Sequence, residues 1–567
     1  MKRWLGLGAL LAFGGLSAVS TASCSNVVGG IGVPTPMPSP PPGTASSGQL
    51  DLLLVVDDST SMGAKQAYLA KALPALLSPL VNPPCVDGAG AWVSQPSDPS
   101  ANCPAQSSRV SQRVTSIHLG VITSSLGGLG SDACPDVTGS FNDAHGHLVV
   151  RTNPDPTYLG YGFLAYDPQG RLSPPGEGDF GTFVQNAEKL VTSVGEHGCG
   201  YEMPLEAAYR FLVDPSPYAS LVKSGGGTYP ITMPSGSFDD ELLEERGRFL
   251  RTDSVVSVIL LTDENDCSVK AGGQWYALLD SAPFFRAASI CESQPSSSCC
   301  YSCGETPPAM CTPDSLCSTS PMYSPAEDSV NLKCFHQKER YGVSSLYPVA
   351  RYVNAFSRAS IVADSDDLTG DGSPSDNPLF KNGRTPSSVI VTAIVGVPWQ
   401  EIANDPSDPF KGTQNASTLV ANGTWARIAG DPDGFVYPTA PVMLESVAKR
   451  PGVNPEENGG DRTLDTSAPV DLQYACTFPL PQPEPGSATC TTPDSPDNPV
   501  CGMGGVQISD KAYPSLRELA VVGGLGERGV VASICPFDPF DNMIPEAGYG
   551  PAMAATVQRL AHAFAPP

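Results

Sequence analysis

The chain is poor in basic residues. Its 567 residues include 32 Lys and Arg against 58 Asp and Glu, which gives a formal net charge of -26 at pH 7. Proteins that bind nucleic acid present a surplus of Lys and Arg to the phosphate backbone, so this composition argues against a nucleic-acid partner. The acidic surface by itself indicates solubility and identifies no partner.

Long apolar runs are also scarce. Residues 1–23 carry Lys2 and Arg3, an apolar stretch over residues 5–19 and then small residues, which is the layout of a secretory signal peptide. After Val19 no segment reaches the ~18 to 20 apolar residues needed to span a bilayer. We therefore expect an exported protein whose membrane attachment is through lipid.

Cys24 is the candidate for that lipid. It follows Thr21-Ala22-Ser23, which resembles a bacterial lipoprotein box, although cleavage at an ordinary small-residue site nearby is the alternative. Ser25 after the cysteine favours the outer membrane and cell surface, with a periplasmic or secreted protein as the alternative. Residues 24–48 form a Pro/Gly/Ser linker that would hold the folded part off a membrane.

The main catalytic signatures are missing. No H-E-x-x-H, G-x-S-x-G or G-x-x-x-x-G-K-[ST] pattern occurs in the chain. The cysteines do not form a matching pair of C-x2-C motifs either, which argues against a zinc site. The sequence therefore predicts a protein that is not an enzyme.

Cysteine itself is abundant. An exported chain with 17 cysteines is expected to form disulfides rather than metal thiolates. Eight cysteines fall between Cys267 and Cys334, and Cys24 apart, the other eight lie at positions 85, 103, 134, 199, 476, 490, 501 and 535. Each set is even in number, so each can close on itself.

Residues 51–62 contain the best candidate for a ligand-binding motif. An apolar run leads into Asp57, Ser59 and Ser61, spaced as D-x-S-x-S. Such a run suits a strand buried on both faces of a parallel sheet, and ligands bind just beyond the carboxyl ends of such strands. Residues 255–263 form a second apolar run that ends in Asp263. Oxygen-bearing side chains converging there suit Mg²⁺, Mn²⁺ or Ca²⁺.

Two weaker patterns leave alternatives open. Asp371, Ser373 and Ser375 repeat the D-x-S-x-S spacing without a preceding strand, in an acidic loop that either rings a calcium ion or forms a solvated turn. His145 and His147 either face one ligand or lie in a surface loop. The strand before Asp57 makes the first copy the better candidate.

The two strand ends resemble the von Willebrand factor A (vWA) domain family. Its metal-ion-dependent adhesion site (MIDAS) uses Asp-x-Ser-x-Ser after the first strand and an Asp after a later one. The resemblance implies a Rossmann-like α/β fold, with a central, mostly parallel sheet flanked by helices. It also implies that Asp57, Ser59, Ser61 and Asp263 hold a divalent cation, with one position left for an acidic group of a partner.

Glu202 departs from the family pattern. It stands where vWA domains place the threonine that completes the metal shell, and no Thr lies close by. A carboxylate in place of a hydroxyl makes the site more anionic. We expect this change to tighten cation binding and to weaken the attraction for a partner's carboxylate.

The resemblance predicts one vWA-like domain over residues 49–565, enlarged by insertions. The insertions are expected at 83–108, 267–335 (rich in cysteine) and 401–510 (rich in loops), with the first two on the same rim as the metal. Apolar periodicity predicts helices at 64–80, 180–194, 204–213, 345–357, 515–522 and 552–564, and further strands at 113–123, 388–397 and 529–534.

The expected function is adhesion or binding at the cell surface. A lipid-anchored protein would use the cation to engage a protein or glycan partner. One alternative is a metal-free structural lipoprotein of the envelope, in which Asp57 and Ser59 only cap the following helix. The other is an exported metal-dependent hydrolase, with Glu202 or Glu264 as a base.

Overall fold

The structure, a computed structural model, describes residues 48–135, 137–223, 231–233, 236–362, 374–538 and 547–564. The predictions made for the signal peptide, for lipidation of Cys24 and for nearly all of the linker therefore lie outside the described residues. The acidic loop from Asp364 to Ser373 lies outside them as well.

A six-stranded sheet forms the centre of the fold. Its strands are β1 (Gln49–Val56), β5 (Ser116–Thr123), β6 (Phe163–Tyr166), β9 (Val255–Leu261), β12 (Val389–Val395) and β16 (Gly529–Ser533). They lie in the order β16-β12-β9-β1-β5-β6, and all neighbours are parallel except β5 and β6. The predicted central, mostly parallel sheet is confirmed. The edge strand β6, only four residues long, was not predicted.

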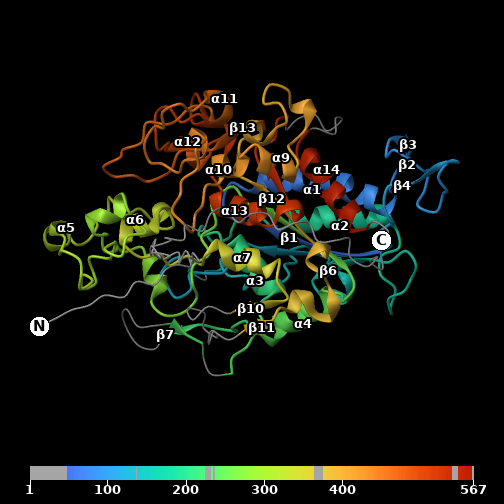
Figure 1. Cartoon of the computed structure of the whole chain (residues 1–567), viewed down its shortest axis with the longest axis horizontal. Coiled ribbons are helices and arrows are strands. Elements are labelled where there is room, and N and C mark those ends of the chain that lie inside the picture. The colour runs from blue at the N-terminus through green and yellow to red at the C-terminus, as the bar shows by residue number, and fades with distance from the viewer. Residues whose placement is uncertain are drawn as a thin grey trace, which may run out of the picture.

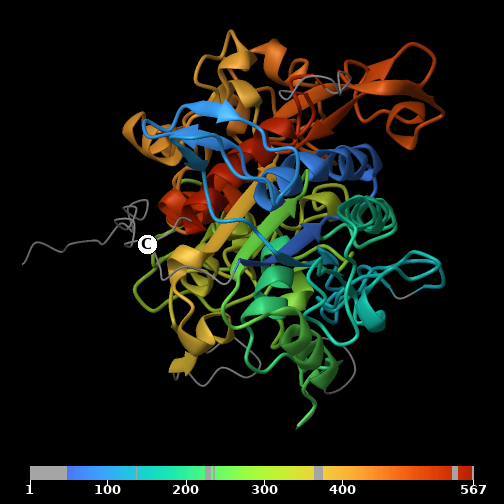
Figure 2. The same ribbon diagram turned by 90° about the vertical axis from the view of Figure 1, so that its right-hand side faces the viewer.

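Helices cover both faces of this sheet. Leu52 and Leu54 of β1 pack into a core with α1 (Gly63–Val81), α2 (Phe180–Thr192) and α14 (Gly550–Ala563). Leu53 and Val55 point the other way, into a core with α3 (Pro204–Leu212), α4 (Asp240–Phe249), α7 (Val349–Ala355) and α13 (Leu516–Gly524). In Figure 1, α1 and α14 lie on one side of β1 and α3 and α4 on the other, and Figure 2 shows the strands side by side between the two layers. The six predicted helices and three further strands are all present, with small shifts of their ends.

The first insertion lies at the amino edge of the sheet. It forms a small antiparallel sheet of β2 (Cys85–Asp87), β3 (Trp92–Ser94) and β4 (Ser107–Arg109), which lies at the right of Figure 1. The backbone N–H of Val114, just before β5, donates to the carbonyl of Leu80 near the end of α1 (2.9 Å). The prediction that residues 83–108 share a rim with the metal site is therefore wrong, because α1 returns the chain to the amino edge before the insertion begins.

The other two insertions begin at the carboxyl edge, after β9 and β12. The first of them holds η2 (Trp275–Leu278), η3 (Ser289–Glu292), α5 (Ser315–Thr319), η4 (Val330–Leu332) and α6 (Gln337–Tyr341). The second holds α8 (Trp399–Ile402), η7 (Pro409–Lys411), α9 (Ala416–Ala421), α10 (Thr424–Ile428), η8 (Pro441–Met443), α11 (Pro455–Asn458) and α12 (Ala488–Thr491). It also carries an antiparallel sheet of β13 (Cys476–Pro485), β15 (Val506–Ala512) and β14 (Cys501–Gly502), so it is less irregular than predicted.

Short elements complete the described parts of the chain. They are β7 (Val222–Lys223), β8 (Ile231–Thr232), β10 (Ser360–Val362), β11 (Pro374–Asp376), η1 (Tyr158–Gly160), η5 (Pro378–Gly383), η6 (Pro386–Ser388) and η9 (Gly526–Arg528). No helix within the described ranges is both long enough and apolar enough to cross a membrane.

Eight disulfides confirm the prediction made from cysteine content. The pairs are Cys85–Cys103, Cys134–Cys199, Cys267–Cys334, Cys291–Cys300, Cys299–Cys311, Cys303–Cys317, Cys476–Cys535 and Cys490–Cys501. The dense set between Cys267 and Cys334 closes on itself, and so does the scattered set. These sixteen cysteines therefore have no thiolate to offer to zinc.

Candidate cation site at the carboxyl edge of the sheet

The predicted site lies where the strand order of the sheet reverses. Counted along the chain, the six strands run 3-2-1-4-5-6 across the sheet, so the first strand, β1, and the fourth, β9, are neighbours. In open α/β sheets ligands bind at such a switch point, outside the carboxyl ends of the strands. Asp57 follows β1 and Asp263 follows β9, so both flank this point.

Asp57 is held by polar groups from both neighbouring strands. Its Oδ1 accepts hydrogen bonds from the backbone N–H of Ser59 (2.8 Å) and from Ser124 Oγ (3.2 Å). Its Oδ2 accepts from Thr262 Oγ1 (2.8 Å). Asp57 is fully buried. Its neighbour Asp58 is engaged elsewhere, because its carboxylate accepts from Ser125 Oγ (2.7 Å) and the Arg151 guanidinium (3.0 Å).

The helix-cap alternative for Asp57 and Ser59 is wrong. Helix α1 is preceded by Met62, and no side chain caps it from that position. Glu196 takes this role instead, because its Oε1 accepts from the backbone N–H groups of Gly63 (2.9 Å) and Ser61 (3.2 Å). The first two residues of the D-x-S-x-S pattern are therefore not needed to satisfy the helix terminus.

Ser61 joins the two strand ends. Its Oγ donates to Asp263 Oδ2 (2.9 Å) across 202 positions of sequence. Ser61 has a φ of 93°, which L-residues adopt rarely and at a cost of about 1 to 3 kcal/mol. The other oxygen, Asp263 Oδ1, is buried and has no hydrogen-bond partner within the described ranges. A buried acceptor without a partner is costly, and this oxygen is therefore the one best suited to coordinate a cation.

Lys65 was missed by the sequence analysis. Its ammonium lies 3.0 Å from Asp263 Oδ2 and 2.7 Å from Asp510 Oδ2, and it donates to the carbonyl oxygen of Ser61 (2.9 Å). Burial acts to lower the pKa of Lys65, but Asp263 and Asp510 raise it above its ordinary value. The sequence did contain a pattern that indicates a buried Lys65, because this residue precedes the buried Leu69 by four positions and so lies on the apolar face of α1.

Glu202 reaches the site from the turn before α3. The side chain is buried, and its backbone carbonyl accepts from the N–H of Cys267 (2.7 Å). Burial raises the pKa of Glu202 well above its usual range, and the charges of Glu264, Asp57 and Asp263 raise it further. A buried carboxyl group therefore lies close to the two strand ends.

The carboxyl groups of the site titrate differently. Burial, with the charge of Asp263, raises the pKa of Asp57 to about 7. Burial raises the pKa of Glu264 to about 8, although Lys511 acts against this. Burial also acts to raise the pKa of Asp263, but Lys65 and Lys511 lower it below its ordinary value. Crowded, buried carboxyl groups favour either protons or a cation.

Residues of both insertions at the carboxyl edge line the site. A pocket of about 300 Å³ is lined by Ser59, Glu202 and Glu264 from the sheet edge, and by residues of the insertions that include Phe335 and Lys511. Asp263 and Glu264 raise the pKa of Lys511 against the opposing effect of burial. The insertions therefore narrow the access to the strand ends and add one more positive charge.

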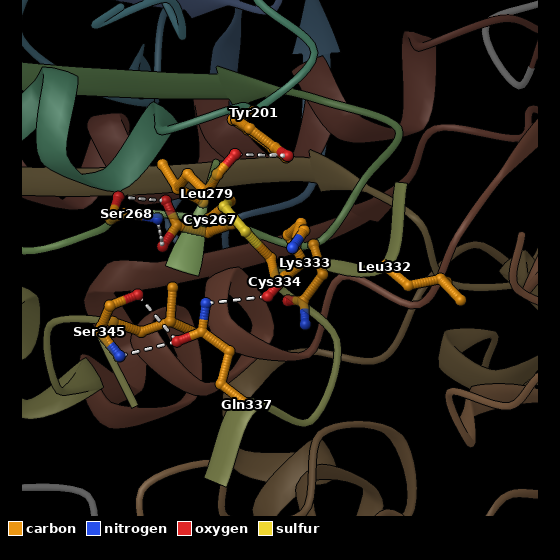
Figure 3. Close-up of a disulfide and its surroundings, with 12 residues drawn as sticks. Tyr201, Cys267, Ser268, Leu279, Leu332, Lys333, Cys334, Gln337 and Ser345 are labelled. Carbon is orange, nitrogen blue, oxygen red and sulfur yellow. Dashed lines mark hydrogen bonds between the residues drawn. A yellow bond between two sulfur atoms is a disulfide. The ribbon is translucent and has the colours of Figure 1, made fainter. Parts of the chain in front are cut away.

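A disulfide fastens one of these walls. Figure 3 shows Cys267, just after the site, bonded to Cys334, which lines the pocket. Nearby, Gln337 Nε2 donates to the carbonyl of Lys333 (3.0 Å), and Gln337 Oε1 accepts from the backbone N–H and the hydroxyl of Ser345 (2.7 and 2.8 Å). The end of the cysteine-rich insertion is thus tied to the carboxyl end of β9.

The two histidines singled out from the sequence contact different carboxylates. His145 Nε2 lies 3.0 Å from Asp143 Oδ2. His147 lies between Asp239 Oδ2 (3.1 Å) and Glu245 Oε1 (3.2 Å). Burial acts to lower the pKa of His147, but these two acids raise it to about 10. His147 is therefore an ion-pair partner at the start of α4, and the pair does not face one ligand.

A cation at this site would need hydroxyl as well as carboxylate ligands. Within the described ranges, no three His, Cys, Asp or Glu side chains are arranged to hold a metal ion by themselves. A cation would therefore need the hydroxyls of Ser59 and Ser61 beside Asp57, Asp263 and Glu202. An all-oxygen set of this kind, with Asp263 Oδ1 unpaired, fits a hard divalent cation.

The fold and the site thus define a class: an α/β protein with a doubly wound, mostly parallel sheet and an acidic, serine-containing site at its switch point. Comparison with protein-family models, with curated proteins and with solved structures found no match.

The metal-free protein is expected to lose stability as pH rises from about 5 to about 8. The folded-state pKa of Asp57 is raised from 3.8 to about 7 and that of Glu264 from 4.5 to about 8. Between these values the folded chain retains protons that the unfolded chain has released, so the free energy of unfolding falls with rising pH. Urea denaturation in EDTA at several pH values would measure this slope.

Asp57→Asn is the matched variant for that measurement. It removes the titrating group but leaves the size of the side chain nearly unchanged, so its slope over the same range should be shallower. His147, whose pKa is raised from 6.5 to about 10, also contributes stability that is lost as the pH rises above about 6.5. This loss is the same in both proteins. Equal slopes in the two proteins would contradict the assignment to Asp57.

Proposed function

We propose that this protein is an exported vWA-domain protein that uses a divalent cation to bind a protein or glycan partner at the cell surface. The cation ligands would be Asp57, Ser59, Ser61, Asp263 and Glu202. Lipid on Cys24 would hold the protein to the outer membrane. The proposal assigns no catalytic activity.

One observation carries this proposal. The D-x-S-x-S turn after β1 meets the carboxylate after β9 at the switch point of the sheet, with Asp263 Oδ1 buried and unpaired among the described residues. The cation would neutralise carboxyl groups that otherwise repel one another, and it would polarise an oxygen of the partner. The mostly parallel sheet and the helices on both of its faces further support the vWA resemblance.

The walls of the site restrict the partner. Phe335 and Lys511 line a pocket of about 300 Å³ that is also lined by Glu202 and Glu264. A pocket of this size admits one side chain or one terminal group rather than a flat surface. The partner would therefore insert a single group toward the cation, and the two insertions would select it.

Isothermal titration calorimetry tests whether a divalent cation binds at this site. Mg²⁺, Mn²⁺ and Ca²⁺ would be titrated into the mature chain, made soluble by Cys24→Ser. We expect saturable binding at one site, which Asp57→Ala and Ser61→Ala abolish. At a cation concentration 100 times the Kd, bound cation should also raise the free energy of unfolding by about 2.7 kcal/mol.

The chain supplies a matched control. Asp371→Ala removes the first residue of the second D-x-S-x-S copy, which no apolar strand precedes. This variant should bind the cation like the wild type. A wild-type protein that binds none of the three cations would refute the proposal, and so would loss of binding in Asp371→Ala but not in Asp57→Ala.

The position of Lys65 supports a second candidate function, that of a metal-free structural protein of the envelope. Its ammonium already lies between Asp263 and Asp510 and supplies a positive charge at the site. In that case the buried ion pairs would lock α1 to the sheet and to β15, and the calorimetric titration would be flat for all three cations.

A further inference from the structure

A second cavity lies beside the candidate cation site. Its volume is about 340 Å³, and it shares Asn265, Cys334 and Glu445 with the wall of the first pocket. The rest of its wall comes from Lys270, from residues 336–348, from residues 429–438 and from the start of α13. Cavities of about 300 to 1,000 Å³ with mixed apolar and polar walls are typical of small-molecule sites.

Aromatic rings form one side of this cavity. The ring of His336 stacks on Phe335, with centroids 4.1 Å apart and planes at 23°. Tyr437 continues the row at 5.0 Å from His336, and its side chain is 42% exposed. Phe435 and Tyr347 also line the cavity. The planes of His336 and Tyr437 are tilted by 37°, so the row is not flat, and the partly exposed ring of Tyr437 is the surface available to a ring-shaped ligand.

Glu445 supplies the polar group. Its Oε1 accepts from Asn265 Nδ2 (3.1 Å), and Asn265 Oδ1 accepts in turn from the backbone N–H of Arg517 (3.0 Å), which holds the amide in place. Glu445 Oε2 lies 3.6 Å from His336 Nε2, too far for a hydrogen bond. Within the described ranges this second oxygen is thus left for a hydroxyl group of a ligand.

The charged groups around the cavity include both signs and are engaged with groups of the protein, which favours a neutral ligand. Lys338 Nζ donates to the carbonyl oxygens of Cys300 (3.4 Å) and Gly342 (2.5 Å), Glu339 Oε1 accepts from the Tyr437 hydroxyl (2.6 Å), and the Lys270 ammonium lies 4.5 Å from the centroid of the Trp275 ring. Asp266 pairs with the Arg517 guanidinium (3.1 Å), and Asp433 accepts from two backbone N–H groups at the start of α7 (2.8 and 3.1 Å). Burial raises the pKa of Glu445 to about 7 and lowers the pKa of His336 to about 4. Near neutral pH the histidine is uncharged and the carboxyl group is partly protonated.

Two residues with strained backbone line this cavity. His336 has a φ of 46° and Phe435 a φ of 57°. Positive φ is rare for large side chains and costs about 1 to 3 kcal/mol for each residue. Such strain persists where surrounding packing imposes it, most often at ligand sites.

We infer that this cavity binds a neutral sugar. The pyranose ring lies on the exposed face of Tyr437, and one hydroxyl group hydrogen-bonds to Glu445 Oε2. This cavity adjoins the site proposed for the cation but contains none of the proposed cation ligands, so sugar binding needs no metal.

Saturation-transfer NMR on the mature chain in EDTA tests this inference. The probes are the methyl glycosides of glucose, galactose and mannose, together with N-acetylglucosamine, each at millimolar concentration. We expect saturation transfer to at least one of them and weaker transfer to glucosamine and glucuronate, which are charged. Tyr437→Ala and Glu445→Gln should each weaken binding at least about tenfold.

Trp92→Ala is the matched control. Trp92 is an exposed aromatic residue (68%) on β3, at the amino edge of the sheet. This variant should bind like the wild type, and melting temperatures would establish that all three variants are folded. The inference is overturned if no neutral sugar shows transfer, if glucosamine binds better than the neutral sugars, or if folded Tyr437→Ala and Glu445→Gln bind like the wild type. Because EDTA is present throughout, failure of the cation proposal leaves this result unaffected.

Discussion

Replacing Lys65 with methionine is expected to lower the free energy of unfolding by about 3 to 5 kcal/mol. The ammonium of Lys65 is fully buried and lies within 3.0 Å of carboxylate oxygens of both Asp263 and Asp510. Methionine approximates the apolar stem of lysine but leaves the two carboxylates buried without the ammonium group. Urea denaturation at pH 7 in EDTA would measure the loss.

Lys71→Met is the control for this effect. Lys71 lies on the exposed side of the same helix, so its replacement should change the free energy of unfolding by less than about 0.5 kcal/mol. A loss below about 1 kcal/mol for Lys65→Met would contradict the expected role of the buried pairs.

The same variant separates the two proposed functions. If the site takes a divalent cation, Mg²⁺ or Ca²⁺ should restore part of the stability that Lys65→Met loses, because the cation replaces the missing positive charge beside Asp263. If Lys65 is the permanent cation of a metal-free scaffold, added cation should restore nothing. Denaturation curves with and without cation would distinguish the two.

Removing the Cys267–Cys334 disulfide is expected to cost about 4 kcal/mol of stability in the chain-entropy model. The bond closes a loop over a sequence separation of 67. Cys334 lines both cavities, and the backbone N–H of Cys267 donates to the carbonyl of Glu202 (2.7 Å). The double variant Cys267→Ser/Cys334→Ser should therefore also weaken ligand binding at both cavities.

Cys85→Ser/Cys103→Ser provides the comparison. This disulfide spans a separation of only 18 and lies in the insertion at the amino edge. It should cost about 3 kcal/mol in the same model and leave both binding sites unchanged. Equal loss of binding in the two double variants would show that the effect comes from general destabilisation rather than from the wall of the site.

The elements of the sheet were largely predictable from sequence. The apolar runs before Asp57 and Asp263 predicted β1 and β9, because a strand buried on both faces needs uninterrupted apolar residues. Helix α1 followed from the spacing of Leu69, Leu73 and Leu76. The edge strand β6 was missed because it has only four residues, and its pairing with β5 depends on a partner distant in sequence.

The site was only partly predictable. The sequence placed Asp57 and Asp263 at strand ends and Glu202 beside them. Lys511 was missed because it reaches the site from β15 in the third insertion, which no local pattern connects to β1 or β9. The prediction that the first insertion lies on the same rim as the metal site was wrong, because the position of this insertion depends on where α1 ends relative to the sheet.

The sequence by itself determined which segments are buried strands and helices, which residues end the strands, and that the cysteines form disulfides. These properties depend on residues close together in the chain or on composition. Only the tertiary structure decided that Lys65 and Lys511 share the site with the carboxylates, that two insertions wall it, and that a second cavity adjoins it. The physical reason is that charges and pocket walls distant in sequence come together only when the sheet and its insertions have assembled.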